Sequence, residues 1–295
     1  MTALAQEKAL DAPERAARFL RALKTGLPLH AKTVALVTAH PDDETIGAGA
    51  LLPRLQGVTV ILATDGAPRN GDDAARQGFA GAAEYAFARS CEFERVMMLA
   101  GVPVADRFCL ALPDQEAAPN LPRLARALVR LFRERDTEIA LTHAYEGGHP
   151  DHDAVAFAVH AAAELRRREG RDIAIVEMPF YRLDGEDWAV QRFVPAPGVE
   201  ETVLPLGEED RAAKRQMLAA HRTQGETLGR FGLDAERFRI APAYDFAALP
   251  NGGRLLYERY GWGMTGSRWL ALAAAASAEL GLGPRPARAA PRAAS

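Results

Sequence analysis

Two short segments of the chain bring histidines and carboxylic acids together. The first reads AHPDDETIG and contains His40 and Asp43, and the second reads EGGHPDHD and contains His149 and His152. His40 and Asp43 are three residues apart around an expected turn, so an imidazole nitrogen and a carboxylate oxygen can converge on one ion. Two imidazoles and one carboxylate form the ligand set of a catalytic zinc site, in which the fourth position is left for water.

A helix start would explain either segment taken alone. Asp42 and the acidic residues after it are of the types that cap a helix or stabilise its amino-terminal dipole. Both segments, however, follow an expected strand, precede an expected helix and combine His with Asp, and this recurrence favours a shared metal site. For His30, His143 and His160 we expect structural roles.

The segments lie in a chain whose expected strands and helices alternate. Apolar runs predict strands over residues 33–37, 58–63, 108–112, 139–142 and 173–178, and helical patterns follow Asp43 and cover about 74–100, 121–135, 153–168 and 208–223. This alternation predicts an α/β fold with a Rossmann-like, mostly parallel sheet and helices on both faces. Both HPD segments then lie at carboxyl ends of strands, where open α/β sheets bind their ligands.

We expect a single α/β domain over residues 31–281. An amphipathic helical extension precedes it over 1–30, and a tail over 282–295, rich in Pro, Ala and Arg, is expected to be disordered. Residues 184–207 are rich in Pro, Gly and charge, which predicts loops or an edge strand within a C-terminal segment that covers the sheet.

The composition narrows the class of partner. The chain has 295 residues, 48% of them hydrophobic and 25% charged, and a net charge of -3, which gives no electrostatic reason to expect nucleic acid. The two cysteines, Cys91 and Cys109, form no CxxC pair, which is typical of a reducing compartment and argues against a cysteine-based metal site. With no apolar run long enough for a membrane span, we expect a cytoplasmic protein that acts on a small molecule; its oligomeric state cannot be read from the sequence.

At the two HPD segments the sequence resembles the PIG-L family, also called LmbE-like proteins, which are mostly zinc-dependent de-N-acetylases of N-acetylglucosamine compounds. The resemblance covers roughly residues 33–225, and AHPDDE and HPDH are its specific motifs. Looser matches are TDG at 64–66, PDQE at 113–116 and HRTQ at 221–224.

The resemblance assigns roles to individual residues. His40, Asp43 and His152 correspond to the ligands of one zinc ion per chain, or of another divalent transition metal. Asp42 corresponds to the general base. His149 corresponds to the residue that stabilises the transition state or protonates the leaving group, and Asp151 to one that orients His149.

The sequence signals for residues that contact substrate are less specific than those for the metal ligands. Arg89 and Asp65 are at positions where similar proteins hold substrate-contacting or site-supporting groups. Salt-bridge and capping roles are the alternative, and Glu92, three residues along the same helix, is the alternative partner of Arg89. Tyr145 is a further candidate, as are three residues of the next expected strand and loop, Tyr181, Arg182 and Trp188. Each of the aromatic residues has ordinary packing as its alternative role.

The expected reaction is removal of an acetyl group from the amide nitrogen of an N-acetylglucosamine-type sugar. Hydrolysis of a non-acetyl amide, such as a mycothiol-type or antibiotic conjugate, stays open, as does a non-catalytic, metal-containing glycan-binding protein. A nucleotide-binding Rossmann module is less compatible, because the turn HPDDETIGAG lacks GxGxxG and its carboxylates would repel a pyrophosphate.

Overall fold

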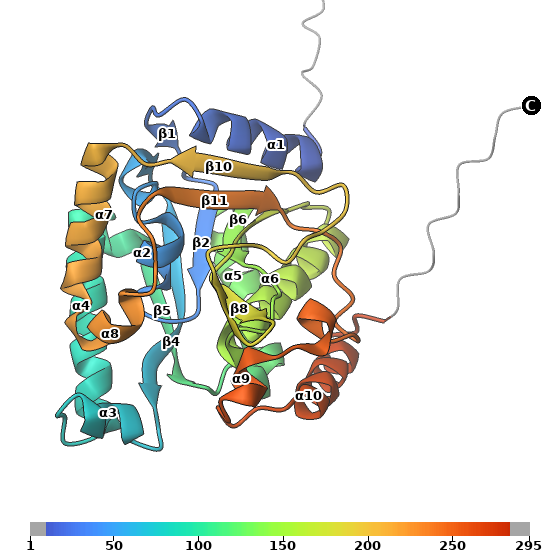
Figure 1. The fold of residues 1–295 in the computed structure, drawn as a ribbon. Helices are drawn as coiled ribbons and strands as arrows, with labels where there is room; N and C mark the ends of the chain where they lie inside the picture. Colours follow the sequence, from blue (N-terminus) through green and yellow to red (C-terminus); the bar gives the residue numbers. More distant parts are fainter. Residues whose placement is uncertain (1–9, 284–295) are drawn as a thin grey trace, which may run out of the picture.

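A seven-stranded sheet with the order β10-β11-β7-β6-β2-β4-β5 forms the centre of the protein in the computed structural model, which describes residues 10–283 (Figure 1). Its strands are β2 (Val34–Thr38), β4 (Thr59–Pro68), β5 (Arg107–Asp114), β6 (Ile139–His143), β7 (Ala174–Met178), β10 (Glu201–Pro205) and β11 (Ala235–Ile240). The five strands from β7 to β5 are parallel, and β11 and β10 extend the sheet in antiparallel pairing. Two two-stranded sheets pair β1 (Leu29–His30) with β3 (Leu55–Gln56) and β8 (Tyr181–Asp184) with β9 (Asp187–Val190).

Helices cover both faces of the sheet. They are α1 (Ala12–Leu23), α2 (Asp43–Ala48), α3 (Asp72–Arg76), α4 (Ala82–Leu99), α5 (Leu121–Glu134), α6 (Pro150–Arg168), α7 (Glu208–Ala220), α8 (Gly225–Leu228), α9 (Leu256–Arg259) and α10 (Gly266–Glu279). Short 3-10 turns cover Leu52–Arg54, Val104–Asp106, Ala118–Asn120, Arg222–Gln224 and Pro250–Gly253. None of these helices is long and apolar enough to cross a membrane.

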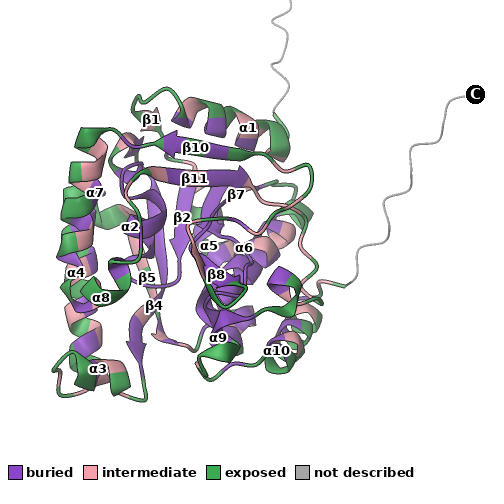
Figure 2. Cartoon of the chain, viewed as in Figure 1, coloured by how far each residue is buried: buried purple, intermediate pink, exposed green. Residues whose placement is uncertain are grey.

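The alternation of side chains along β2 divides the core into two layers. Val34 and Leu36 belong to one apolar cluster with residues of α1, α2, α4 and α7, whereas Ala35 and Val37 belong to a second cluster with α5, α6 and α10. Because successive side chains of a strand point to opposite faces, a strand buried on both faces must be apolar throughout. Figure 2 shows the result, in which the central strands are buried and the outer faces of the helices are exposed.

The chain leaves β2 in two directions. It adds β4 and β5 on one side of β2, then returns to add β6 and β7 on the other. The carboxyl ends of β2 and β6 therefore flank the point where the strand order reverses, and at such a point the loops diverge and leave a crevice for a ligand. Both HPD segments follow these two strands.

The predicted fold class is confirmed, and the predicted strands are present with boundaries shifted by a few residues. The helix expected over 74–100 is two helices, α3 and α4, because the segment between them contains Gly78 and Gly81 and the backbone of Gly78 is left-handed. The edge strand expected within 184–207 is β10, whereas β11 was not predicted.

The N-terminal helix starts at a capping box between Asp11 and Glu14. Its apolar face, including Phe19 and Leu23, packs into the same cluster as β2 and β7, so α1 shares the core of the sheet. The tail expected to be disordered lies outside the described residues, apart from Leu282 and Gly283. The domain boundaries stay predictions.

Candidate metal centre and its cavity

The four residues of the two HPD segments that could bind a metal lie together at the carboxyl edge of the sheet. His40 and Asp43 follow β2, and His149 and His152 lie at the start of α6, beyond β6. All four are buried, with at most 8% of any residue exposed. The crossover of the chain therefore joins segments more than 100 residues apart.

The ligand-bearing atoms of this group converge. Asp43 is 3.3 Å from His40, between Oδ2 and Nδ1, and 3.3 Å from His152, between Oδ1 and Nε2. The ring centroid of His149 is 4.5 Å from that of His40 and 5.4 Å from that of His152. Nitrogens of all three histidines lie within 4.8 Å of one another, so the geometry allows His149 as well as His152 to be a ligand.

Two observations fit a transition metal in this place. Both ring nitrogens of His152 are buried without a hydrogen-bond partner in the described structure, an arrangement that costs free energy unless an ion or water binds them. Burial raises the pKa of Asp43, but His152 and His143 lower it by more, so its pKa is well below the usual range and the carboxyl is ionised. Imidazole nitrogens and a carboxylate are ligands that zinc prefers.

Asp42 is held next to the cluster in a strained conformation. Its φ of 130° lies in the region that favours glycine, and such strain persists only where the surroundings enforce it. Glu44 accepts the Asp42 N–H at 3.0 Å, and Arg89 donates to both Asp42 Oδ2 at 3.0 Å and the Pro41 carbonyl at 2.5 Å. Burial raises the pKa of the Asp42 carboxyl to about 7, although Arg89 opposes this shift.

His149 caps helix α6. Its Nδ1 accepts the backbone N–H of Asp151 at 3.2 Å, and its Nε2 lies 3.8 Å from Oδ1 of Asp114. Burial, followed by the nearby His40, lowers the pKa of His149 well below its usual value, which leaves the ring neutral.

Asp151, which was expected to orient His149, contacts it through its backbone N–H, whereas its carboxylate is directed elsewhere. That carboxylate accepts the backbone N–H groups of Gln115 at 2.6 Å and Ala117 at 3.0 Å and lies 3.2 Å from Nε2 of His40. The side chain turns this way because the segment after β5 presents two backbone donors to the start of α6. Asp151 therefore supports His40 and the 115–117 segment.

Arg89 lines the cavity, as expected of a residue of the site, but its side chain is buried. It is 4% exposed, and its guanidinium is occupied by Asp42 and two backbone carbonyls, those of Pro41 and Gly66. The alternative pairing with Glu92 is wrong, because Glu92 accepts the N–H and hydroxyl of Thr223 instead.

Asp65 and Tyr145, the other predicted substrate contacts, do not line the cavity. Asp65 pairs with Arg69, and the Tyr145 hydroxyl donates to the Ala248 carbonyl at 3.0 Å and accepts from Trp269 Nε1 at 2.6 Å. Tyr145 is 4% exposed within the α5–α6–α10 core, so its role is packing. Of the later candidates, Tyr181 and Trp188 line the cavity, whereas Arg182 does not.

Four buried polar residues outside the predicted site lie beside the cluster, among them His143, for which a structural role was expected. Asp114 ends β5 within the PDQE match and is 3.3 Å from Nε2 of His40. His221 opens HRTQ and lies 3.0 Å from Glu44 Oε1, so that His221 and Glu44 form a buried pair behind Asp42. His143, the last residue of β6, accepts the Ala39 N–H at 2.9 Å and stacks on His152.

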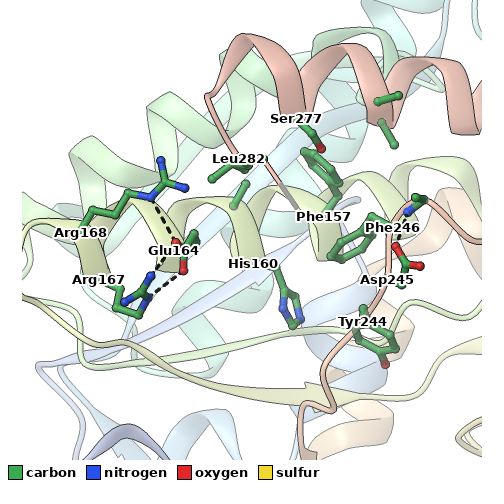
Figure 3. A pocket seen from close by; sticks show the side chains of 15 residues that line it. Phe157, His160, Glu164, Arg167, Arg168, Tyr244, Asp245, Phe246, Ser277 and Leu282 are labelled. Atoms are coloured by element: carbon green, nitrogen blue, oxygen red, sulfur yellow. Dashed lines mark hydrogen bonds and ion pairs between the residues drawn. The ribbon is translucent and has the colours of Figure 1, made fainter. Parts of the chain in front are cut away.

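The cluster opens into a cavity of about 490 Å³. A larger cavity of about 800 Å³ lies elsewhere, between α6, α10 and residues 244–247. Figure 3 shows the latter, where Glu164 is paired with Arg167 and Arg168 and the aromatic rings of Phe157, Tyr244 and Phe246 form a wall. We place the functional site at the smaller cavity, because the convergent histidines and carboxylates line it.

Comparison with known proteins agrees with this placement. The model of the PIG-L family, described as GlcNAc-PI de-N-acetylase, matches residues 35–163, which include both HPD segments. A 1D-myo-inositol 2-acetamido-2-deoxy-alpha-D-glucopyranoside deacetylase of Nakamurella multipartita is 30% identical over 234 residues, which cover 65% of this chain and 79% of that protein. The chain belongs to the PIG-L family.

Two further proteins are similar to this PIG-L protein, one in sequence and one in fold. A second deacetylase named for the same inositol glycoside, from Catenulispora acidiphila, is 29% identical over 163 residues, which cover 48% of this chain and 54% of that one, so the chain spans about half the length of this relative. A deacetylase of the teicoplanin biosynthesis pathway, solved in complex with bog, superimposes with a TM-score of 0.56 at 16% identity, covering 72% of this chain and 99% of its own. This structural likeness shows that the PIG-L protein shares the fold of that deacetylase.

Proposed function

We propose that this protein is a metal-dependent hydrolase that removes the acetyl group from the amide nitrogen of an N-acetylglucosamine-type glycoside. The observation that carries the proposal is a buried carboxyl outside the predicted ligand set, that of Asp42. It lies directly beside His40, Asp43 and His152, of which the two histidines each approach Asp43 to 3.3 Å. The family and the names of the relatives, which are deacetylases of an inositol glycoside of N-acetylglucosamine, support the same reaction.

We assign the metal, taken to be one zinc-class ion per chain, to His40, Asp43 and His152. When bound there, such an ion lowers the pKa of a coordinated water and polarises the amide carbonyl. The carboxyl of Asp43 is ionised, and a ring nitrogen of His152 that has no hydrogen-bond partner would be available to that ion.

The residues around the ligands supply the proton transfers. Asp42 takes a proton from the attacking water, and its raised pKa of about 7 is close to the value at which a general base works best near neutral pH. His149 lines the same cavity from the other HPD segment, where its ring can donate to the oxyanion or to the departing nitrogen. Arg89 holds Asp42 in place.

A non-acetyl amide as substrate remains a second candidate, because the chemistry of the cluster is the same for any linear amide. One experiment decides between the two candidates. It measures the release of acetate and free amine from a panel of N-acetylated sugars and their glycosides, with metal-loaded protein and with protein in chelator. Metal-dependent release from at least one sugar supports the proposal. Absence of release from every sugar, together with cleavage of a longer acyl amide, would replace it by the second candidate.

A further inference from the structure

His152, the proposed metal ligand in the first turn of α6, lacks the hydrogen bond that usually orients such a ring. A histidine that ligates a metal commonly donates its second ring nitrogen to an acceptor, and that bond fixes the ring. Here Nε2 of His152 faces Asp43 at 3.3 Å, and within residues 10–283 its Nδ1 has no hydrogen-bond partner. The orientation of the His152 ring therefore depends on the groups that pack around it.

Three aromatic rings pack around His152. The ring of Phe180 meets it edge-on with 5.1 Å between centroids, and the ring of Tyr181 is tilted against it, also at 5.1 Å. His143 stacks on it at 4.2 Å. His143 is the last residue of β6, so the sheet holds it. Phe180 and Tyr181, in contrast, lie where β7 has ended and the hairpin of β8 and β9 begins, so they need a support of their own.

Glu146 supplies that support. Its Oε1 accepts the backbone N–H of Phe180 at 2.8 Å and that of Tyr181 at 3.1 Å. All three residues are buried, so without this oxygen two buried donors would lose their acceptor, which costs free energy. The backbone of Gly148 adds a second contact, because a Cβ at this position would lie 1.9 Å from the Tyr181 carbonyl oxygen. Residues 146–148 and 180–181 are thus fixed against each other.

The backbone of Glu146 is in turn held by helix α6. Asp153, the residue after His152, accepts the backbone N–H of Glu146 at 3.2 Å and that of Gly147 at 3.0 Å. The contacts therefore form a closed loop, from Asp153 to Glu146, on to the aromatic pair, and back to the ring of His152. Burial raises the pKa of the Glu146 carboxyl well above its usual value, which favours the neutral form, so this support adds no charge beside the ligands.

We propose that Glu146 is a positioning residue of the metal centre. It fixes Phe180 and Tyr181, and through their rings it sets the orientation in which His152 meets the ion. This inference rests on the proposed function, because it takes His152 as a ligand. Residues that orient a ligand contribute about tenfold to a hundredfold to metal affinity or activity. A merely structural acceptor, in contrast, would affect stability and leave the metal centre unchanged.

The test compares Glu146→Gln with Glu146→Ala. Glutamine keeps a carbonyl oxygen for the two N–H groups, whereas alanine leaves both without an acceptor. We expect the Kd for zinc to rise about tenfold to a hundredfold in Glu146→Ala and to stay within about threefold of wild type in Glu146→Gln. The visible spectrum of cobalt-loaded protein, which reports ligand geometry, should change in the alanine variant alone. A wild-type Kd and spectrum in Glu146→Ala, or equal losses in both variants, would overturn the inference and leave the proposed function standing.

Glu236 provides a matched control that separates positioning from loss of stability. It is a second buried carboxyl that accepts two consecutive backbone N–H groups, those of Ala50 at 2.8 Å and Leu51 at 3.0 Å. Glu236→Ala also removes the partner of Lys214, so it should lower the urea midpoint at least as much as Glu146→Ala. Its Kd for zinc and its cobalt spectrum should nevertheless be those of wild type. Equal losses of metal affinity in the two alanine variants would make Glu146 a structural residue only.

A measurement on metal-free protein keeps the inference testable if the wild type binds no ion. The ring-proton NMR signals of His152, assigned by comparison with His152→Gln, are shifted by the ring currents of Phe180 and Tyr181. In chelator these signals should move in Glu146→Ala and keep their positions in Glu146→Gln, and signals that do not move in Glu146→Ala would overturn the inference. Glu146→Met, which fills the space but accepts no N–H group, replaces the alanine variant if that variant does not fold. Absence of metal binding by the wild type would count against the proposed function instead.

Discussion

The guanidinium of Arg89 lies 3.0 Å from the carboxylate of Asp42, between Nη2 and Oδ2, with both residues less than a tenth exposed. Arg89 comes from the middle of α4, whereas Asp42 lies in the loop after β2. Because the same guanidinium also binds the Pro41 carbonyl, Arg89 fixes the backbone as well as the side chain of the proposed general base.

Replacing Arg89 by Met should therefore affect both turnover and stability. The variant leaves Asp42 buried beside Asp43 without its cation, and breaking a buried ion pair costs about 3–5 kcal/mol. We expect kcat to fall by about tenfold to a hundredfold, within the contribution of a positioned base. Urea unfolding and steady-state kinetics measure the two effects. Arg95→Met, an exposed position on the same helix, is the control, and wild-type kcat in the Arg89 variant would show that Asp42 needs no such support.

Asp42→Asn should distinguish a general-base role of Asp42 from a role as a metal ligand. The amide has nearly the shape of the carboxyl and can keep the contact to Arg89 through its oxygen, so fold and metal content should not change. Turnover should fall by roughly 10²- to 10⁴-fold, mainly in kcat, because the lost interaction operates in the transition state. Metal analysis and kinetics on one preparation check this. A variant that loses its metal would identify Asp42 as a ligand.

The metal content of variants should show which of His152 and His149 is a ligand. The distances alone do not decide this. We expect about one zinc-class ion per wild-type chain. His152→Ala should lose tight metal binding together with activity, whereas His149→Ala should keep the metal and lose turnover. Metal content after dialysis, with added zinc, iron or cobalt to test for recovery, provides the measurement. The reverse result would exchange their roles, since either ring is near His40.

The position of the site was predictable from the sequence, whereas most of its support was not. HPDD and HPDH each follow an apolar run, and the rule that strand ends share one edge of a parallel sheet brings them together. The partner of Arg89 could not be predicted in this way. Local spacing offered Glu92, whereas the packing of α4 against β4 brings Arg89 to Asp42. Likewise Tyr145 directly precedes the second HPD segment in sequence, but its side chain lies in the core. Trp262, which contacts His149, comes from a segment more than 100 residues further along the chain.

The buried pair of His221 and Glu44 should make stability depend on pH in a defined direction. Burial lowers the pKa of His221, but the Glu44 carboxylate at 3.0 Å raises it by more, and the net shift is upward. A histidine whose pKa is higher in the folded state than its unfolded value of about 6.5 binds its proton more tightly when folded. Its contribution to the free energy of unfolding is complete below that unfolded pKa and is lost as pH rises through the folded pKa.

The difference in free energy of unfolding between wild type and His221→Gln should thus be larger at pH 5.5 than at pH 9, measured in chelator so that metal release does not contribute. His30→Gln, whose histidine is exposed, should show no such difference. A gap between wild type and His221→Gln that is constant or widens with pH would mean that His221 is neutral in the folded protein.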